Sequence, residues 1–331
     1  MDMAGAALSK TGIFTVSKNL VASLRASGVD VVEFAPTKPV DGRTYLPWFH
    51  CVLPHLVNRA SVEAMVYPAN MLPLVVPATV NIVLLHDVIW ESFPNDYNLV
   101  WRIALRYGAL HALKNAKVIS PSQWTADAVL KRFGRHVSMV LPYQFRRTPR
   151  KADAVKNQSR DVVYVGSLVG HKNVETLIRG FENIASSFPG AVLHIVGDGP
   201  YRQHLERLSQ QLVTSRQIVF HGFISEERKK ALLSAARVFV QPSLEEGFSL
   251  TPWEASALGA DLVLSAIPAH EVFREFAWCF RPGSPEDCAR ALFSCLTTEP
   301  GQPLHREFSG EFNIDNYAEE IKRIATWTCV I

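Results

Sequence analysis

The sequence lacks most of the patterns that would assign it to a specialised class of protein. Its five cysteines are odd in number and include no Cys-x-x-Cys pair, so neither a disulfide framework nor a zinc site is indicated. The net charge is only +3, which argues against general nucleic-acid binding but is compatible with anionic substrates or a membrane surface. The N-terminus, MDMAGAALSKTG, has no basic start followed by an apolar core, so no signal peptide is indicated and we expect a cytoplasmic protein.

One uncharged stretch, residues 64–85, is long enough to span a bilayer. Three prolines, Pro68, Pro73 and Pro77, divide it into pieces that are too short for a helix to survive between them. We therefore expect two buried strands joined by a proline-rich loop rather than a membrane span.

The composition, 48% hydrophobic and 20% charged, is that of an ordinary globular protein, and 331 residues allow two domains of about 150 residues each. From residue 161 onward, apolar runs alternate with segments of helical periodicity, which predicts a parallel, doubly wound α/β domain. After a strand at 161–166, we expect helices over 173–187, 200–212, 225–235 and 252–258, and strands over 191–196, 217–220, 238–240 and 261–264.

The first half of the sequence has a similar pattern but a weak beginning. Residues 1–9 are rich in alanine and only weakly strand-like, so the first strand is weak or missing. We then expect helices over 15–26, 94–112 and 123–133, the last capped by Ser122, and strands over 29–34 and 80–85.

A polar, basic segment without apolar periodicity separates the two halves. We therefore expect an N-terminal Rossmann-like domain over 1–148, a linker over 149–160, a second Rossmann-like domain over 161–312, and a C-terminal helix within 313–331.

The stretch from Gln241 to Gly259, QPSLEEGFSLTPWEASALG, has the features of a ligand-binding turn. The apolar run 238–240 before it is expected to be a buried strand that ends at a proline. Thr251, Pro252 and Glu254 form a helix-start signature, with threonine as N-cap, proline in the first turn and glutamate three residues after the cap. The turn therefore lies at the carboxyl end of a strand and the amino end of a helix, where α/β sheets bind ligands and phosphate groups.

The same stretch resembles the hallmark of the retaining nucleotide-sugar glycosyltransferases of the GT-B fold, in the large family called GT4, whose pattern is P-S-x-x-E-G-F-G-L-P-x-x-E-A-x-x-x-G. The sequence matches over 242–259, including Glu246 and Glu254, and departs at Ser249 and Thr251, where the pattern has glycine and proline. The resemblance implies an α/β fold of two Rossmann-like, doubly wound parallel-sheet domains that face each other across a cleft. It also implies that the first domain binds the acceptor and that the C-terminal helix crosses back to that domain.

A second glycine-bearing turn, GSLVGHKN, runs from Gly166 to Asn173 between a strand and a helix. Such a turn presents backbone N–H groups and Lys172 to a phosphate, although a solvated surface lysine is the alternative. In the resembling family this lysine meets the donor diphosphate, and Ser167 stands where arginine is common. The sequence Gly-Asp-Gly at 197–199 lacks the third glycine of a dinucleotide fingerprint, so we interpret it as a tight turn and do not favour an NAD-dependent oxidoreductase.

The resemblance also assigns roles to single residues. It implies that Glu246 approaches the donor sugar, that Glu254 binds the ribose in addition to capping its helix, and that His86, at the end of strand 80–85, lies near the transferred sugar. A lone histidine is otherwise more often structural. The implied catalytic group is Glu246, His86 and Lys172. The implied donor site comprises Gly12, Gly166, Ser167, Lys172, Phe223, Ile224, Gly247, Phe248, Ser249, Leu250 and Glu254, with the base held mainly by backbone near Phe223 and Ile224.

The activity that the resemblance implies is transfer of a hexose of the mannose or glucose type, with retention, from a nucleoside-diphosphate sugar to a saccharide or lipid-linked saccharide. No two aspartates lie two residues apart, so the Asp-x-Asp metal-binding pattern of the other major glycosyltransferase fold is absent, and we expect neither a metal ion nor a cofactor. The alternative is a non-catalytic or truncated sugar-nucleotide-binding homologue, which the weak first strand and Ser167 keep open.

The helix expected over 94–112 carries three aromatic residues, Tyr97, Trp101 and Tyr107, with two arginines on another side. Aromatic residues at helical spacing are more often part of the core, which is the interpretation we favour. Together with the mildly basic composition, this helix also motivates a peripheral contact with the cytoplasmic face of a membrane.

Overall fold

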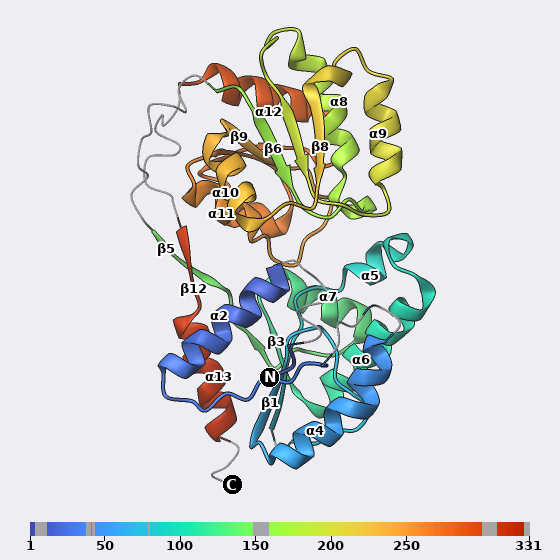
Figure 1. Ribbon diagram of the computed structural model, residues 1–331, viewed down its shortest axis with the longest axis vertical. Coiled ribbons are helices and arrows are strands. Elements are labelled where there is room, and N and C mark those ends of the chain that lie inside the picture. Colours follow the sequence, from blue (N-terminus) through green and yellow to red (C-terminus); the bar gives the residue numbers. More distant parts are fainter. Residues whose placement is uncertain are drawn as a thin grey trace. The chain divides into compact units, whose positions relative to one another are not determined.

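The computed structural model divides into two compact units (Figure 1), Met1–Gln144 with Asn313–Ile331 as unit 1 and Phe145–Phe312 as unit 2. Each unit contains a parallel sheet with helices, which confirms the predicted α/β fold class. The structure describes residues 1–3, 12–37, 41, 44–78, 80–147, 159–299 and 310–327. The expected linker, 149–160, lies outside the described residues except for its last two positions.

Unit 1 is built on a four-stranded parallel sheet in the order β1-β2-β3-β4, with β1 at Ala64–Tyr67, β2 at Val80–Leu84, β3 at Lys117–Ser120 and β4 at Met139–Val140. The uncharged stretch 64–85 forms two buried strands, as predicted, because β1 and β2 pair from Ala64↔Val80 to Tyr67↔Val83. Within the part of the chain that the structure describes, no helix is long and apolar enough to cross a membrane.

The N-terminal residues add a short extended segment beside β1. The backbone N–H of Asp2 donates to the carbonyl of Val66 (3.1 Å). The N–H of Met3 donates to the carbonyl of Phe34 (2.9 Å), and the N–H of Phe34 donates to the carbonyl of Met1 (2.9 Å). The predicted strand over 29–34 is wrong apart from a single bridge between Phe34 and Asp2. The carbonyls before Phe34 have other partners, because that of Val31 accepts from the Arg25 guanidinium (3.0 Å) and that of Val32 accepts from the N-terminal amine (2.6 Å).

Helices surround this sheet: α2 Gly12–Ala26, α3 Tyr45–Pro47, η1 Trp48–Val52, α4 Leu53–Ala60, α5 Ile89–Ser92, η2 Pro94–Asp96, α6 Leu99–Asn115, α7 Gln123–Phe133 and α13 Asp315–Trp327. Ser122 caps α7, as predicted, because its hydroxyl accepts from the N–H of Thr125. The C-terminal helix α13 packs on α2, where Ser23 donates to Asp315 (2.9 Å) and Lys322 donates to the carbonyl of Ser27 (3.0 Å). Strands β5 Gln144–Arg147 and β12 Gly310–Asn313 pair where the chain passes from one unit to the other.

Unit 2 contains a six-stranded parallel sheet in the order β11-β10-β9-β6-β7-β8. The strands are β6 Val162–Val165, β7 Leu193–Val196, β8 Ile218–Gly222, β9 Val238–Gln241, β10 Asp261–Ser265 and β11 Ala277–Phe280. The chain first adds strands to one side of β6 and then, from β9 on, to the other side. This is the doubly wound order, and its switch point lies between β6 and β9.

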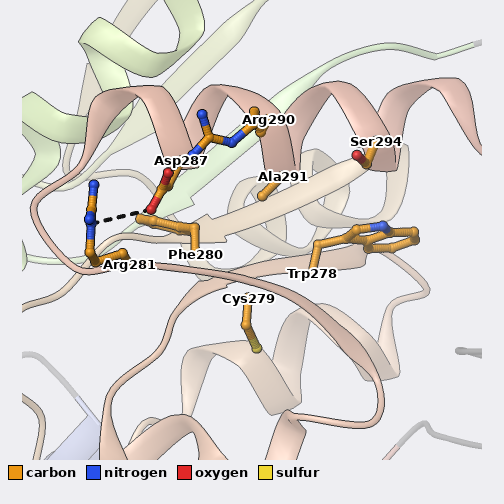
Figure 2. A pocket seen from close by; sticks show the side chains of 8 residues that line it. All are labelled: Trp278, Cys279, Phe280, Arg281, Asp287, Arg290, Ala291 and Ser294. Carbon is orange, nitrogen blue, oxygen red and sulfur yellow. Dashed lines mark hydrogen bonds and ion pairs between the residues drawn. The ribbon is translucent and has the colours of Figure 1, made fainter.

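The sequence did not lead us to expect β11 or the helix α12, Pro285–Thr297. Together they line a shallow pocket of about 330 Å³ (Figure 2). Arg281 and Arg290 both pair with Asp287 at this pocket, and Trp278 lies along its other side.

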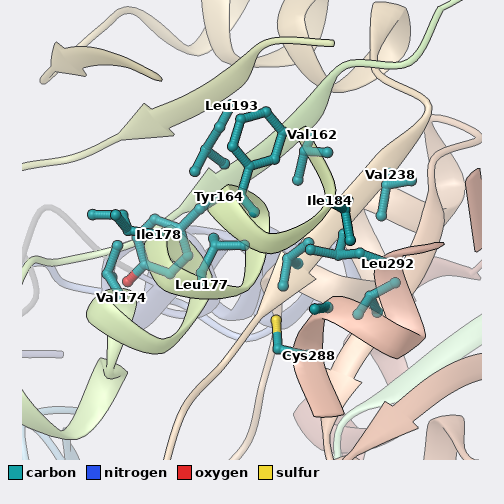
Figure 3. Packing of buried hydrophobic residues seen from close by; sticks show 14 of the residues in the cluster. Val162, Tyr164, Val174, Leu177, Ile178, Ile184, Leu193, Val238, Cys288 and Leu292 are labelled. Carbon is teal, nitrogen blue, oxygen red and sulfur yellow. The ribbon is translucent and has the colours of Figure 1, made fainter. Parts of the chain in front are cut away.

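The core of unit 2 follows the alternation of side chains along its strands. Val162 and Tyr164 of β6 pack against α8, Val174–Ala185, and against α12 (Figure 3), while Val163 points to the opposite face. There it packs with Leu233 of α10, Glu226–Ala235, and Trp253 of α11, Thr251–Ala257. A further helix, α9 Arg202–Gln210, contributes Leu205 and Leu208 to the first face. Helices on both faces bury both sides of the sheet, which explains its continuously apolar strands.

We expect Gly197→Ala to destabilise unit 2 strongly. Gly197 has φ +126°, and a Cβ atom there would lie 1.9 Å from the carbonyl oxygen of Gly166. Both the backbone conformation and the close approach require glycine, so the loss should be about 3 kcal/mol or more. Urea unfolding followed by circular dichroism measures it. Gly190→Ala is the matched control, because nothing lies within 4 Å of its added Cβ. Equal stability of the two variants would contradict this account.

Candidate active site

Most of the functional residues expected in unit 2 follow the carboxyl ends of the neighbouring strands β6 and β9, whereas Phe223 and Ile224 follow β8 at the edge of the sheet. After β6 the chain forms the short helix η4, Gly170–Lys172, and after β9 it forms the loop 242–250. The two segments are tied together, because the N–H of Leu244 donates to the carbonyl of His171 (2.8 Å) and the Asn173 amide donates to that of Pro242 (3.3 Å). The switch point of the sheet therefore brings segments distant in sequence into contact.

A buried ion pair lies at the centre of this arrangement. Lys172 Nζ is 2.6 Å from Glu246 Oε1, and the two side chains are only 18% and 7% exposed. The same carboxylate oxygen accepts from Gln241 Nε2 and from Ser243 Oγ, each at 2.6 Å. Three donors thus converge on a single oxygen atom of Glu246.

The environment keeps the Glu246 carboxylate ionised. Burial by itself would raise the pKa of Glu246, but the charge of Lys172, then the electrostatic effect of His171 and the hydrogen bonds from Lys172 and Ser243, lower that pKa to about 2. At neutral pH the side chain is therefore a hydrogen-bond acceptor and cannot act as a general acid.

Glu254 does not have the capping role expected for it. Helix α11 begins at Thr251, after Leu250, which is already in the helical region (φ −80°, ψ −37°) and makes no side-chain cap hydrogen bond. Thr251 therefore lies inside the first turn, where its hydroxyl cannot serve as N-cap, and the predicted capping box is wrong. The Glu254 carboxylate, 35% exposed, instead pairs with Lys229 of α10 at 3.0 Å.

The remaining donor-site residues of unit 2 lie on neighbouring segments. A Cβ at Gly166 would lie 2.6 Å from the Tyr164 hydroxyl, which donates to the carbonyl of Ser167, so glycine is required there. Phe223, directly after β8, is 71% exposed. The others are buried or half-buried: Ser167, Ile224, Gly247, Phe248, Ser249 and Leu250. None of the expected site residues lines the pocket of Figure 2.

Gly12 and His86 belong to unit 1. Gly12 is the first residue of α2. His86 is 9% exposed, and both of its ring nitrogens are engaged, Nε2 with the carbonyl of Pro68 (2.8 Å) and Nδ1 with the Tyr143 hydroxyl (3.0 Å). Because a carbonyl only accepts, Nε2 carries the hydrogen and Nδ1 accepts from Tyr143. Desolvation of the ring lowers the pKa of His86 to about 4, against the opposing effect of the Pro68 hydrogen bond. This is the geometry of a structural histidine, and its catalytic role stays a prediction.

Sequence reasoning missed three members of the buried network: Gln241, Ser243 and His270. Gln241 begins the quoted stretch and Ser243 is the serine of the family pattern, so their spacing from Glu246 was a usable signal. His270 had no such signal, because it lies in the short helix η6, Pro268–Phe273, more than twenty residues after Glu246.

We expect His86→Gln to flatten the dependence of stability on pH. Between pH 6.5 and pH 4 the unfolded chain binds a proton on this histidine and the folded protein does not. The free energy of unfolding therefore decreases by up to about 3 kcal/mol as the pH is lowered through this range. Glutamine does not titrate, so the variant should lose this term. Urea unfolding at pH 7 and pH 4 measures the difference. The exposed His55→Gln serves as control, and an unchanged pH dependence in His86→Gln would refute the assignment.

Comparison with known proteins places this geometry in a family. Residues 145–309 match the family described as "Glycosyl transferases group 1". An uncharacterised glycosyltransferase of Methanocaldococcus jannaschii is 35% identical over 118 residues, which are 36% of this chain and 30% of that protein. The O-antigen chain mannosyltransferase RfbU of Salmonella typhimurium is 21% identical over 291 residues, which are 86% of this chain and 78% of that protein. The chain thus spans less than a third of the archaeal relative's length.

Among solved structures, Anabaena HepE in complex with UDP and glucose matches with a TM-score of 0.64 at 15% identity, over 97% of this chain and 96% of that chain. At this identity the likeness shows the fold alone, and it agrees with the two parallel-sheet units described above. The family match shows that the chain belongs to the glycosyl transferases group 1 family, and the likeness to solved structures shows that it has the GT-B fold.

Proposed function

We propose that the chain is a retaining glycosyltransferase that moves a hexose of the mannose or glucose type from a nucleoside-diphosphate sugar to a saccharide or lipid-linked saccharide, in polysaccharide or glycoconjugate synthesis. The observation that carries this proposal is the buried pair of Lys172 and Glu246 at the carboxyl ends of β6 and β9. The Salmonella relative is a mannosyltransferase and HepE was solved with UDP and glucose, which supports a hexose donor of this kind.

The pair suits the chemistry of a departing diphosphate. The ammonium of Lys172 has three hydrogens, and its bond to Glu246 uses one of them, so two remain for phosphate oxygens. Its positive charge stabilises the negative charge that develops as the bond between the anomeric carbon and the diphosphate breaks. Helix α8 begins directly after this segment, and its dipole favours negative charge at that end.

Glu246 is suited to hold the sugar rather than to attack it. All three of its hydrogen bonds fall on Oε1, and within the described residues no hydrogen bond to Oε2 is formed. Oε2 is therefore available to accept from a sugar hydroxyl. A carboxylate that is held by three donors and stays ionised is a weak nucleophile, so we assign it no covalent role.

Two further residues complete the proposed donor site. Glu254 accepts from ribose hydroxyls through its exposed part while keeping Lys229 as partner. Phe223 lies beside the base, to which its exposed ring offers an apolar surface. We propose no metal ion or cofactor, because Lys172 supplies the positive charge that the diphosphate needs.

We expect one nucleotide among UDP, GDP and ADP to raise the melting temperature of the wild type, and Lys172→Ala and Glu254→Ala to abolish that rise. Binding to the folded state alone stabilises by about 2.7 kcal/mol at a ligand concentration 100 times Kd. The same donor sugar should be transferred to a saccharide acceptor, with its anomeric configuration kept, in the presence of EDTA. Thermal-shift assays and NMR of the product measure these outcomes.

The matched control is Glu271→Ala, which removes an exposed glutamate of the same unit and should keep the full thermal shift. A thermal shift without transfer or hydrolysis would favour the non-catalytic homologue. Loss of activity in EDTA would contradict the proposed metal independence. Absence of a thermal shift with all three nucleotides would refute the proposed donor site.

We also propose that α6 contacts a membrane surface. Leu99, Val100, Ile103 and Tyr107 are 64%, 65%, 49% and 67% exposed. At about 100° per residue these four positions fall within roughly one quarter to one third of the helix circumference, which makes one continuous apolar stripe. Tyr97 and Trp101 pack against the core as favoured from the sequence, but the same expectation for Tyr107 was wrong. Arg102 and Arg106 lie beside the stripe on the same helix, Arg106 paired with Glu91, and basic side chains in this position suit anionic headgroups.

We expect the protein to bind vesicles containing phosphatidylglycerol and Ile103→Glu/Tyr107→Glu to bind them about ten-fold more weakly or not at all, because the variant places charge in the apolar stripe. Vesicle co-sedimentation measures the bound fraction. Val213→Glu, at a 94% exposed position of unit 2, is the control for added charge and should bind as the wild type does. Absence of wild-type binding to anionic vesicles would rule out this contact.

A further inference from the structure

A buried histidine that has no part in the proposed chemistry lies at one end of the Glu246 network. His270 is 1% exposed and lies on η6, close after the end of β10. Its ring packs edge-on against Phe273 at a centroid distance of 6.5 Å. A polar ring this deeply buried needs partners for both nitrogens.

The hydrogen bonds of His270 give the ring a direction. Nδ1 is 2.8 Å from the carbonyl oxygen of Ser265, and a carbonyl only accepts, so Nδ1 carries the hydrogen. Burial lowers the pKa of His270, against the charge of Glu246, which favours the neutral ring. Nε2 then carries a lone pair and accepts from the Ser249 hydroxyl at 2.9 Å.

The chain of hydrogen bonds continues from Ser249 to Glu246. Gln241 Nε2 has two hydrogens, and it donates one to Glu246 Oε1 at 2.6 Å and the other to Ser249 Oγ at 3.3 Å. Turning the amide around would place its oxygen against the Glu246 carboxylate, which is electrostatically unfavourable. The orientation of Gln241 is therefore fixed from both sides.

A parallel support starts from the same end of β10. The Ser265 hydroxyl donates to the carbonyl of Ser243 at 2.6 Å, and the Ser243 hydroxyl donates to Glu246 Oε1. His270 thus supports the donor Gln241 through Ser249, and Ser265 supports the donor Ser243. The third donor is Lys172.

We propose that His270 is a positioning residue that fixes the Glu246 carboxylate through Ser249 and Gln241, in the orientation that receives the donor sugar. The kinetic part of this inference rests on the proposed glycosyl transfer. Ser249, where the resembling pattern has glycine, connects His270 to Gln241, because a glycine there would offer no hydroxyl to His270.

The test that needs no activity is a double-mutant cycle of His270→Phe with Glu246→Gln, read as urea midpoints. Phenylalanine keeps an aromatic ring but offers no acceptor to Ser249. His270 is connected to Glu246 through Ser249 and Gln241. We therefore expect the double variant to shift the midpoint less than the sum of the single shifts. The cycle of His270→Phe with Glu254→Gln is the control and should be additive. An additive result with Glu246→Gln would overturn the proposal.

The kinetic test separates positioning from folding. For His270→Phe we expect kcat/KM for the sugar nucleotide to fall about ten- to hundred-fold, with the Kd of the free nucleoside diphosphate unchanged within about two-fold. His270→Gln, which can restore an acceptor for Ser249, should recover part of the loss. The exposed His204→Phe is the control and should transfer as the wild type does. Wild-type rates in His270→Phe would overturn the proposal, whereas an inactive wild type would refute the proposed function and leave the decision to the cycle.

Discussion

The burial of one ion pair, Lys172 with Glu246, governs the organisation of the site. At an effective dielectric constant of about 20, two charges 2.6 Å apart attract by about 6 kcal/mol. Removing each of them from water costs several kcal/mol, so the pair by itself is close to neutral for stability. The hydrogen bonds from Gln241 and Ser243 to the same carboxylate oxygen make the arrangement favourable. The conformation of the loop after β9 therefore depends on the whole set of donors.

This pair exists because of the order of the strands. Lys172 and Glu246 are 74 positions apart in sequence, and they meet because β6 and β9 are neighbours in a sheet whose strands all point the same way. The turn after β6 also packs closely against the turn after β7, where a Cβ at Gly197 would overlap the backbone of Gly166. Glycine at these turns lets two backbones approach closely enough to bring both loops to one edge of the sheet.

The sequence predicted what depends on local pattern and missed what depends on distant partners. Strands β6 to β10 and their helices follow from apolar runs and helical periodicity, and the cap at Ser122 follows from residue type. The capping box at Thr251 was wrong because the preceding Leu250 is already helical, which residue type does not reveal. His270 was missed for a different reason, since its partners Ser249 and Ser265 lie on other segments. A hydrogen-bond network of this kind has no fixed spacing in sequence.

The departures from the family pattern bear on whether the site is intact. A serine at position 249 places a hydroxyl in a position that is 3% exposed, which would be costly without partners. His270 and Gln241 supply both an acceptor and a donor for it, so the change is accommodated without disturbing Glu246. At Ser167 the backbone carbonyl accepts from Tyr164, and the turn still presents Lys172 to Glu246. The changes at Ser249 and Ser167 thus leave the charged pair of Lys172 and Glu246 in place, which argues against a homologue that has lost the proposed chemistry.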